Sequence, residues 1–263
     1  VLNTDQKNAF YHLSEKINAD DLIQVVLIQH EFGLFIKNEA NLIQFLYKTR
    51  KAAIIVFHTV LPNPNSSFKV NVQVITQLAH SIIVMTHSAA QILINDYGVD
   101  SDKITVIAHG THLVQHSDKK LLKEEYNLSG KKVLSTFGLL SSGKSIETTL
   151  DAMPEIISEN EDVLFLIIGK THPSVAKEEG EKYRMMLETK IQTLQLENHV
   201  LFINTFLPLP QLLDFLQLTD IYLFTSNDPN QAVSGTFSYA ISCGCPIIST
   251  PIPHASEVLS GGA

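Results

Sequence analysis

Two stretches of the sequence combine glycine with residues that can hold an anion. The first, Gly138-Leu-Leu-Ser-Ser-Gly-Lys-Ser145, joins a predicted strand to a predicted helix, where main-chain amides and the ammonium of Lys144 can cradle a phosphate. The second is Ser234-Gly235-Thr236, at the predicted start of a helix, where unbonded amides and the helix dipole favour negative charge. Glycine also lets a ligand approach the main chain closely. Each stretch can therefore hold an anion by itself: Gly138 and Lys144 in the first, and Ser234, Gly235 and Thr236 in the second.

Each stretch has a second interpretation. An ordinary crossover between strand and helix would also explain the second stretch. The first fits the bare P-loop pattern Gly-x4-Gly-Lys-Ser, so a P-loop phosphotransferase is an alternative. Such a domain normally opens with this loop and needs an aspartate at a strand end for magnesium. Here about half of the chain precedes the loop, and the later predicted strands end in Gly169, Asn204 and Ser226, which makes the phosphotransferase less favoured.

Histidines follow two of the predicted strands. His30 and Glu31 come directly after the aliphatic run 22–28, and His58 follows the run 52–57. Open α/β sheets bind ligands at the carboxyl ends of their strands, and a histidine there can donate to a hydroxyl or phosphate, or accept a proton. Alternatively, Glu31 caps or solvates the following helix, and the histidines are ordinary hydrogen-bonded or packed loop residues.

The elements that position these residues alternate between strands and helices. Apolar runs of strand length and stripes of helical period predict an α/β fold with two doubly wound, Rossmann-like domains facing across a cleft. We place the domains at residues 1–114 and 115–263, with the linker at the start of the polar stretch 115–132. The run 22–28 suits a strand covered on both faces. The predicted strands are 22–28, 52–57, 82–85, 104–107, 132–137, 163–168, 200–203, 221–224 and 247–248, and the predicted helices are 5–18, 38–50, 67–80, 88–97, 145–157, 178–196, 209–218 and 231–241.

Composition excludes several classes of function. The 263 residues, 44% of them hydrophobic, can bury a sizeable core, and a formal net charge of −8 argues against a nucleic-acid surface.

Cys243 and Cys245 are too close for an ordinary disulfide and too few for a zinc site, so we expect buried thiols in a reducing compartment. Neither a membrane-spanning run nor a signal peptide is evident. Because the chain starts at Val1 and stops after Ser260-Gly-Gly-Ala263, we expect a piece of a longer protein, incomplete at both ends.

The segment around residues 230–250 resembles a known family. The ending Ala240-Ile-Ser-Cys-Gly-Cys-Pro-Ile-Ile-Ser-Thr250, after a polar loop and a helix, is similar to the donor-binding segment of retaining glycosyltransferases of family 4, which have the GT-B fold. Gln231 and Tyr239 stand where that family has two glutamates that hold the donor sugar and the ribose. A mannosyltransferase-like branch resembles the chain more closely, through Asn230-Gln-Ala followed by Ser-Gly-Thr236 and through Gln29-His-Glu-Phe-Gly33.

The resemblance implies a function. It implies transfer of a hexose, mannose by preference, from a nucleotide sugar to a saccharide or lipid-linked acceptor with retention at the anomeric carbon. The donor would be GDP-mannose or a UDP-hexose, with no metal and no cofactor. The setting implied is polysaccharide biosynthesis in the cytoplasm, with peripheral association at the inner membrane surface. A donor-altered or non-catalytic GT-B sugar-binding protein is the alternative, because Gln231, Tyr239 and Leu139 replace two glutamates and an arginine of the family.

The resemblance also implies roles for individual residues. Phe57-His-Thr-Val-Leu-Pro62 is similar to the family segment whose histidine lies beside the donor sugar and acceptor, so His58 and Lys144 are the expected catalytic residues. Lys144 would stabilise the leaving diphosphate. On the acceptor or sugar side we expect His30, Glu31 and His58. The expected donor-binding residues are Gly138, Lys144, Asn230, Gln231, Ser234, Gly235, Thr236 and Tyr239.

Overall fold

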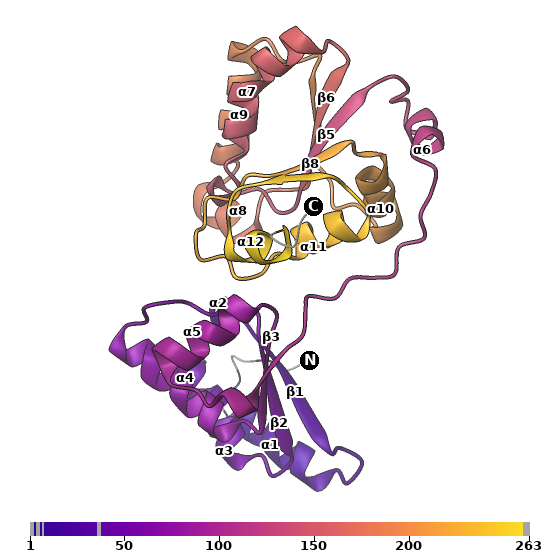
Figure 1. The fold of residues 1–263 in the computed structure, drawn as a ribbon. Helices are drawn as coiled ribbons and strands as arrows, with labels where there is room; N and C mark the ends of the chain where they lie inside the picture. The colour runs from indigo at the N-terminus through magenta and orange to yellow at the C-terminus, as the bar shows by residue number, and fades with distance from the viewer. Residues whose placement is uncertain (1–2, 4–5, 7, 36–37, 260–263) are drawn as a thin grey trace. The chain divides into compact units, whose positions relative to one another are not determined.

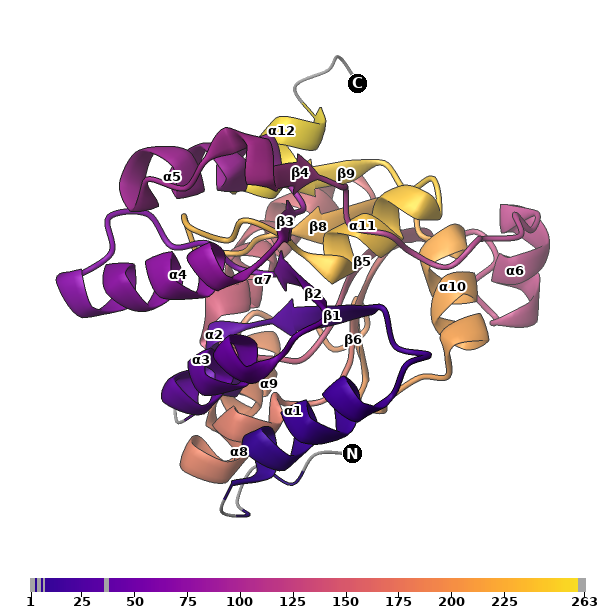
Figure 2. The same cartoon turned by 90° about the horizontal axis from the view of Figure 1, so that it is seen from below.

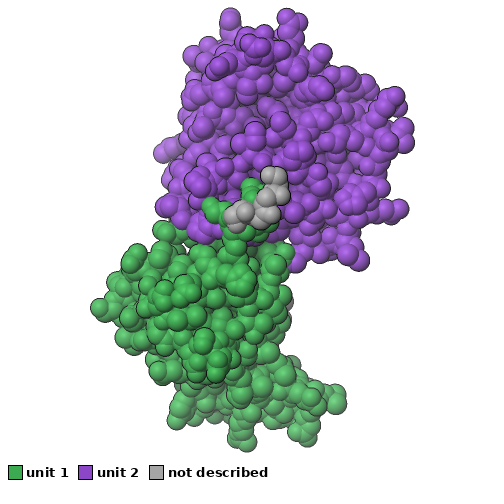
Figure 3. All heavy atoms as spheres, viewed as in Figure 1, with its two compact units in different colours: residues 1–109, 230–233, 256–263 green, residues 110–229, 234–255 purple. Residues whose placement is uncertain are grey.

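The computed structural model describes residues 3, 6, 8–35 and 38–259, which fold into alternating strands and helices (Figure 1). The chain divides into two compact units (Figure 3), unit 1 with residues 1–109, 230–233 and 256–263, and unit 2 with residues 110–229 and 234–255. The expected domain boundary after residue 114 lies inside the segment 107–118, which has neither helix nor strand. Val1 and residues 260–263, on which the expectation of an incomplete chain rested, lie outside the described residues.

Unit 1 contains a four-stranded parallel sheet in the order β1-β2-β3-β4 (Figure 2). The strands are β1 (Val25–His30), β2 (Ala52–Phe57), β3 (Ser81–Val84) and β4 (Ile104–Val106). Because all four strands run parallel, their carboxyl ends lie at one edge of the sheet. The helices are α1 (Ala9–Ala19), α2 (Phe32–Phe35), α3 (Glu39–Lys48), α4 (Ser66–Leu78) and α5 (His87–Tyr97), with a 3₁₀ turn at Ser101–Lys103.

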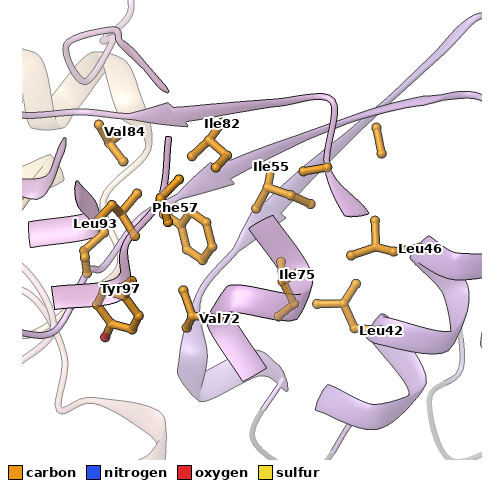
Figure 4. Close-up of a cluster of buried hydrophobic side chains, with 14 of the residues drawn as sticks. Leu42, Leu46, Ile55, Phe57, Val72, Ile75, Ile82, Val84, Leu93 and Tyr97 are labelled. Atoms are coloured by element: carbon orange, nitrogen blue, oxygen red, sulfur yellow. The ribbon is translucent and has the colours of Figure 1, made fainter. Parts of the chain in front are cut away.

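The core of unit 1 lies between one face of this sheet and its helices (Figure 4). Alternate strand residues such as Ile55, Phe57, Ile82 and Val84 pack there against the helical side chains Leu42, Leu46, Val72, Ile75, Leu93 and Tyr97. The expectation that residues 22–28 are covered on both faces is wrong. The strand begins at Val25 and lies at the edge of the sheet, with Val25 51% and Leu27 55% exposed. A continuous aliphatic run does not reveal whether the second face is covered, and here the helices cover the first.

Unit 2 contains a five-stranded parallel sheet in the order β7-β6-β5-β8-β9. Its strands are β5 (Lys132–Phe137), β6 (Val163–Ile168), β7 (Val200–Ile203), β8 (Ile221–Phe224) and β9 (Ile247–Ser249). The chain moves outward from β5 to β7 and then returns to the other side of β5. This reversal places a topological switch point between β5 and β8, where such sheets bind ligands.

Helices cover both faces of the unit 2 sheet, as expected for a doubly wound domain. One core joins α7 and α9 to side chains such as Phe165 and Ile167, and the other joins α6 and α10 to Leu166 and Ile168. No helix in the described part of the chain is long and apolar enough to span a bilayer. The helices are α6 (Lys119–Glu125), α7 (Ile146–Glu159), α8 (Pro173–Glu179), α9 (Lys182–Thr193), α10 (Leu209–Leu218), α11 (Gly235–Ser242) and α12 (Pro253–Leu259), with a 3₁₀ turn η2 at Ser142–Lys144.

All nine predicted strands are present, four in one sheet and five in the other. The predicted helix 231–241 begins instead at Gly235, because Ser234 has an extended backbone and caps the helix with its side chain. The sequence patterns did not predict the short helices α2, α6 and α8, and of α12 they indicated only a helix start near Glu257. Short helices show little periodicity, so this signal is weak in them.

Candidate functional site

Two glycine turns meet at the carboxyl ends of β5 and β6. Gly138 and Gly169 have φ of +133° and +131°, and a Cβ on Gly169 would lie 2.0 Å from the carbonyl oxygen of Gly138. The Gly138 amide donates to the Ile168 carbonyl at 3.0 Å, and the Leu140 amide donates to the Lys170 carbonyl at 2.8 Å. Only glycine fits this contact, which fixes the loop after β5 against the loop after β6.

Lys144 lies over the first of these turns. It ends η2, and its Nζ is 3.6 Å from the position that a Cβ would take on Gly138 and 5.4 Å from the ring centroid of Phe224. Burial lowers the pKa of Lys144, because removal from water disfavours the charged form. No carboxylate in the described part of the chain forms an ion pair with this ammonium. A desolvated cation at a switch point is suited to an anionic ligand.

The loop after β8 holds the Lys144 loop in place. The hydroxyl of Thr225 donates to the Lys144 carbonyl at 2.7 Å, and the Asn227 amide donates to the Gly143 carbonyl at 3.1 Å. Both bonds are to main-chain atoms, so they fix the path of the loop. The Lys144 ammonium is not used in either bond.

The N-terminus of α11 lies at the same place. The Ser234 hydroxyl accepts from the Phe237 amide at 3.3 Å, and the Ser234 amide donates to Nδ1 of His254 at 3.0 Å. The amides of Gly235 and Thr236 have no hydrogen-bond partner among the described residues. A Cβ on Gly138 would lie 3.1 Å from Cγ2 of Thr236. The structure therefore brings Gly138, Lys144 and Thr236 together, while Ser234, which is 4% exposed, is engaged in capping the helix.

Tyr222 lies beneath this cluster and was not singled out from the sequence. Its side chain is fully buried in β8, and its hydroxyl lies near Thr236 and donates to the Phe137 carbonyl at 3.4 Å. Burial raises the pKa of Tyr222 to about 12, so the hydroxyl stays neutral. It links the end of β5 to the start of α11.

An apolar pocket adjoins Gly138 and Gly169. Its lining includes Leu139, Ile168, Phe206, Leu207 and Leu212, with Lys170 at the same pocket. Phe206 is 81% exposed and Leu139 39% exposed, so both offer apolar surface to a ligand. The sequence patterns did not indicate this pocket, although an aromatic residue shortly after a strand end, as Phe206 is after β7, is a signal for it.

Tyr239, an expected donor-binding residue, contacts the segment 107–118. Its hydroxyl bonds to Nδ1 of His112 at 2.5 Å, and the hydroxyls of Thr111 and Ser242 are 2.6 Å apart. These contacts fasten the segment to α11 within unit 2. Asn230 and Gln231 belong to unit 1, and the neighbouring Ala232 is part of the unit 1 core, whereas residues 234–236 belong to unit 2. The donor-binding roles of Asn230, Gln231 and Tyr239 stay predictions.

The second polar cluster lies in unit 1, at the carboxyl ends of β1 and β2. Gln29 Oε1 is 2.6 Å from Nε2 of His58, and the Thr59 hydroxyl donates to Oε2 of Glu31 at 2.7 Å. Side chains on the two neighbouring strand ends therefore fix His58 and Glu31. His58 is partly exposed, so a ligand can reach it.

His30 differs from these neighbours because its imidazole is fully buried. Its ring centroid lies 4.8 Å from that of Phe32, 5.1 Å from that of Phe35 and 4.9 Å from that of Phe57. Burial, with a smaller contribution from His58, lowers the pKa of His30 to about 4, so the ring is neutral at pH 7. The expected roles of His30, Glu31 and His58 on the sugar side stay predictions.

Cys243 and Cys245 are free and buried, as expected. Burial raises the pKa of Cys243 to about 11 and that of Cys245 to about 12, so both remain thiols at neutral pH. Among the described residues, no group of three or more His, Cys, Asp or Glu side chains is placed to hold a metal ion.

Several solved structures are similar to this chain. Anabaena Alr3699/HepE in complex with UDP has a TM-score of 0.73 at 19% identity, covering 95% of this chain and 65% of that chain. A glycosyltransferase from Rickettsia africae has a TM-score of 0.73 at 18% identity, covering 98% and 66%. The pneumococcal O-GlcNAc transferase GtfA in complex with UDP and GlcNAc has a TM-score of 0.70 at 17% identity, covering 94% and 46%. This chain spans less than two thirds of the length of each of these structures.

These likenesses confirm the expected α/β fold of the GT-B class. No curated protein sequence matches the chain. The model of the family described as glycosyl transferases group 1 matches residues 118–263, more than half of the chain and nearly all of unit 2. The chain belongs to the glycosyl transferases group 1 family.

Proposed function

We propose that the protein transfers a hexose from a nucleotide sugar to an acceptor hydroxyl. The observation that carries the proposal is the unneutralised ammonium of Lys144, held beside Gly138 and the N-terminus of α11 at the switch point of unit 2. An ammonium and two unbonded amides, of Gly235 and Thr236, form a fixed arrangement of positive charge for a diphosphate. Because these groups are already in place, they also stabilise the charge that develops on the leaving diphosphate.

The apolar pocket beside Gly138 suits the nucleobase of the donor. A flat aromatic ring placed there would contact Leu139, Ile168 and Phe206, while its attached phosphates would lie near Gly138 and Lys144. Structural neighbours of this chain bind UDP, UDP-glucose and UDP-2-fluoro glucose. We therefore take a UDP-hexose as the first donor to test and GDP-mannose, which the resemblance to the mannosyltransferase-like branch implies, as the second.

The finer assignments follow from the family 4 resemblance. His58 would contact the transferred sugar, with Glu31 beside the acceptor, and transfer would retain the anomeric configuration. The acceptor would be a saccharide or a lipid-linked saccharide made in polysaccharide biosynthesis, with the enzyme in the cytoplasm or peripherally at the inner membrane surface. In this mechanism Lys144 and the α11 amides supply the positive charge at the leaving group.

Calorimetric titration with UDP, GDP, UDP-glucose, GDP-mannose and magnesium-ATP tests the proposal. We expect saturable binding of one nucleoside diphosphate and its sugar. Lys144→Ala should weaken it roughly 10- to 100-fold, since a hydrogen bond to a charged group contributes about 1.5–3 kcal/mol. Lys177→Ala, which removes an exposed lysine from α8, is the matched control and should leave affinity unchanged.

The same titration separates the alternatives. Binding of magnesium-ATP alone would identify a P-loop phosphotransferase, whose pattern the Gly138 loop also fits. A protein that binds a nucleotide sugar in the titration but neither transfers nor hydrolyses it in an activity assay would be the donor-altered or non-catalytic form. The observation that favours this second candidate is the Tyr239 hydroxyl, which bonds His112 at the position where the related family has a ribose-binding glutamate.

A further inference from the structure

His30 ends β1 with a buried imidazole that is not satisfied. Neither Nδ1 nor Nε2 has a hydrogen-bond partner among the described residues, and the side chain is 0% exposed. Three phenylalanine rings surround it, from Phe32, Phe35 and Phe57. The buried His254 of unit 2, by contrast, accepts a hydrogen bond from the Ser234 amide.

Such a group lowers the stability of the fold. A buried polar atom without a partner loses its hydrogen bonds to water and gains none, and native proteins contain few of them. Phenylalanine or leucine would fill the same aromatic surroundings without this loss. Stability of the fold therefore does not explain an imidazole at this position, which points to a role in binding.

On one side, the imidazole of His30 is covered by two phenylalanine side chains from the short helix α2. Phe35 stacks on the imidazole with 7° between the ring planes, and Phe32 meets it edge-on and packs on Phe68 of α4 at 4.4 Å. Both Phe32 and Phe35 belong to α2, a single turn of four residues, and Leu34 between them is 73% exposed. A single turn with few buried contacts opens at low free-energy cost.

On the other side, His30 adjoins the polar cluster of unit 1. Its carbonyl accepts from the His58 amide at 2.9 Å, and the next residue, Glu31, accepts from Thr59. The cluster thus contains imidazoles, an amide and a carboxylate. A neutral hydroxyl, which both donates and accepts, matches this set better than an anion, which the carboxylate would repel.

We propose that His30 is a ligand-binding residue whose imidazole is covered by Phe32 and Phe35 in the absence of ligand. A hydroxyl of the acceptor saccharide displaces the Phe35 ring and forms a hydrogen bond with the imidazole. The choice of an acceptor saccharide rests on the proposed function. The inference that Phe32 and Phe35 cover a ligand-binding imidazole rests on the geometry of unit 1 alone. In this arrangement the cover competes with the ligand, so weakening the cover should strengthen binding.

NMR titration of the His30 ring signals tests this competition, with methyl α-glucoside and methyl α-mannoside as the probes. Phe35→Ala should bind its preferred probe roughly three- to tenfold more tightly than the unmodified chain, because less of the protein is in the covered state. Leu34→Ala, from the same turn but exposed, is the matched control and should not change affinity. If Phe35→Ala does not fold, Phe35→Leu replaces it.

A second variant distinguishes a ligand-binding role of His30 from a purely structural one. His30→Phe should raise the melting temperature and weaken probe binding at least about tenfold, the loss expected from one hydrogen bond to an otherwise unpaired group. His254→Phe, which removes a bonded buried histidine, should lower the melting temperature instead. A lower melting temperature for His30→Phe, unchanged or weaker binding by the Phe35 variant, or no shift with either glycoside would overturn the inference. UDP titration of the same samples reports on the donor site, so failure of the proposed function is recognised separately.

Discussion

In unit 2 the ammonium of Lys144 lies beside a glycine and a helix N-terminus, whereas in unit 1 the imidazole of His30 lies behind two phenylalanine rings. Both groups are desolvated, and both have a pKa shifted away from the charged form. The difference is in what surrounds them. Main-chain contacts hold the Lys144 loop in an assembled state, while a single helical turn covers His30. The groups of unit 2 are therefore accessible as they stand, whereas the imidazole of His30 is accessible only if the turn opens.

The assembled state of unit 2 depends most on Gly169. Alanine there would place its Cβ 2.0 Å from the Gly138 carbonyl oxygen at a φ of +131°, so one of the two loops must move. We expect Gly169→Ala to lower the free energy of unfolding by about 3 kcal/mol or more and to abolish nucleotide binding. Denaturant unfolding and UDP titration measure the two effects.

Gly180→Ala is the matched control for backbone strain. Gly180 also has a positive φ, +68°, but no atom lies within 4 Å of its Cβ position. Because its ψ of −141° lies outside the left-handed helical region, this variant should lose about 1–3 kcal/mol to backbone strain and keep its nucleotide affinity. Equal losses in the two variants would mean that the loop contact contributes nothing beyond backbone strain.

His30 should make the stability of the protein depend on pH. Its pKa is about 4 in the folded state, below the ordinary histidine value of about 6.5, so between these two values the unfolded chain binds more protons. The free energy of unfolding is therefore unaffected by His30 above pH 6.5, and it falls by about 3 kcal/mol in all as the pH drops towards 4. Unfolding free energies at pH 7 and pH 4 measure this loss, which His30→Phe should lack. A loss of the same size in His30→Phe would assign it to other groups.

Lys144 should make nucleotide affinity depend on pH on the alkaline side. Because burial lowers its pKa, the ammonium loses its proton at a lower pH than an ordinary lysine, and affinity for UDP should fall as the pH rises through that value. Lys144→Arg keeps its charge at every pH used and should show a flat profile. The expected loss for the unmodified chain is roughly tenfold, and a matching loss in the arginine variant would exclude Lys144 as its source.

The same contrast explains what the sequence could predict. The loops that carry Lys144 and Thr236 leave strands that end at residues 137 and 224, and parallel strands bring their carboxyl ends to one edge, so pattern and spacing predicted an anion-binding loop at each. That β5 and β8 are neighbours, which brings the two loops together, is known only from the structure. The cover on His30 depends on a four-residue helix, which has no periodicity to detect. The bond between Tyr239 and His112 joins residues 127 positions apart, and neither residue type predicts the other. Contacts made by a loop and by a single turn therefore cannot be predicted from residue pattern and spacing.

Tyr239 provides the smallest expected effect and decides a question about the donor site. Its hydroxyl bonds His112 in the segment 107–118, so Tyr239→Phe should leave this segment held to α11 by the Thr111–Ser242 bond and lose about 1 kcal/mol, the net contribution of one hydrogen bond. We expect faster proteolysis within residues 107–118 and an unchanged affinity for UDP. Ser242→Ala, which removes the neighbouring bond to Thr111, should have the same effect. If Tyr239→Phe alone weakens UDP binding while the segment stays protected, the hydroxyl contacts the donor, and Tyr239 takes the place of the family's glutamate in function as well as in position.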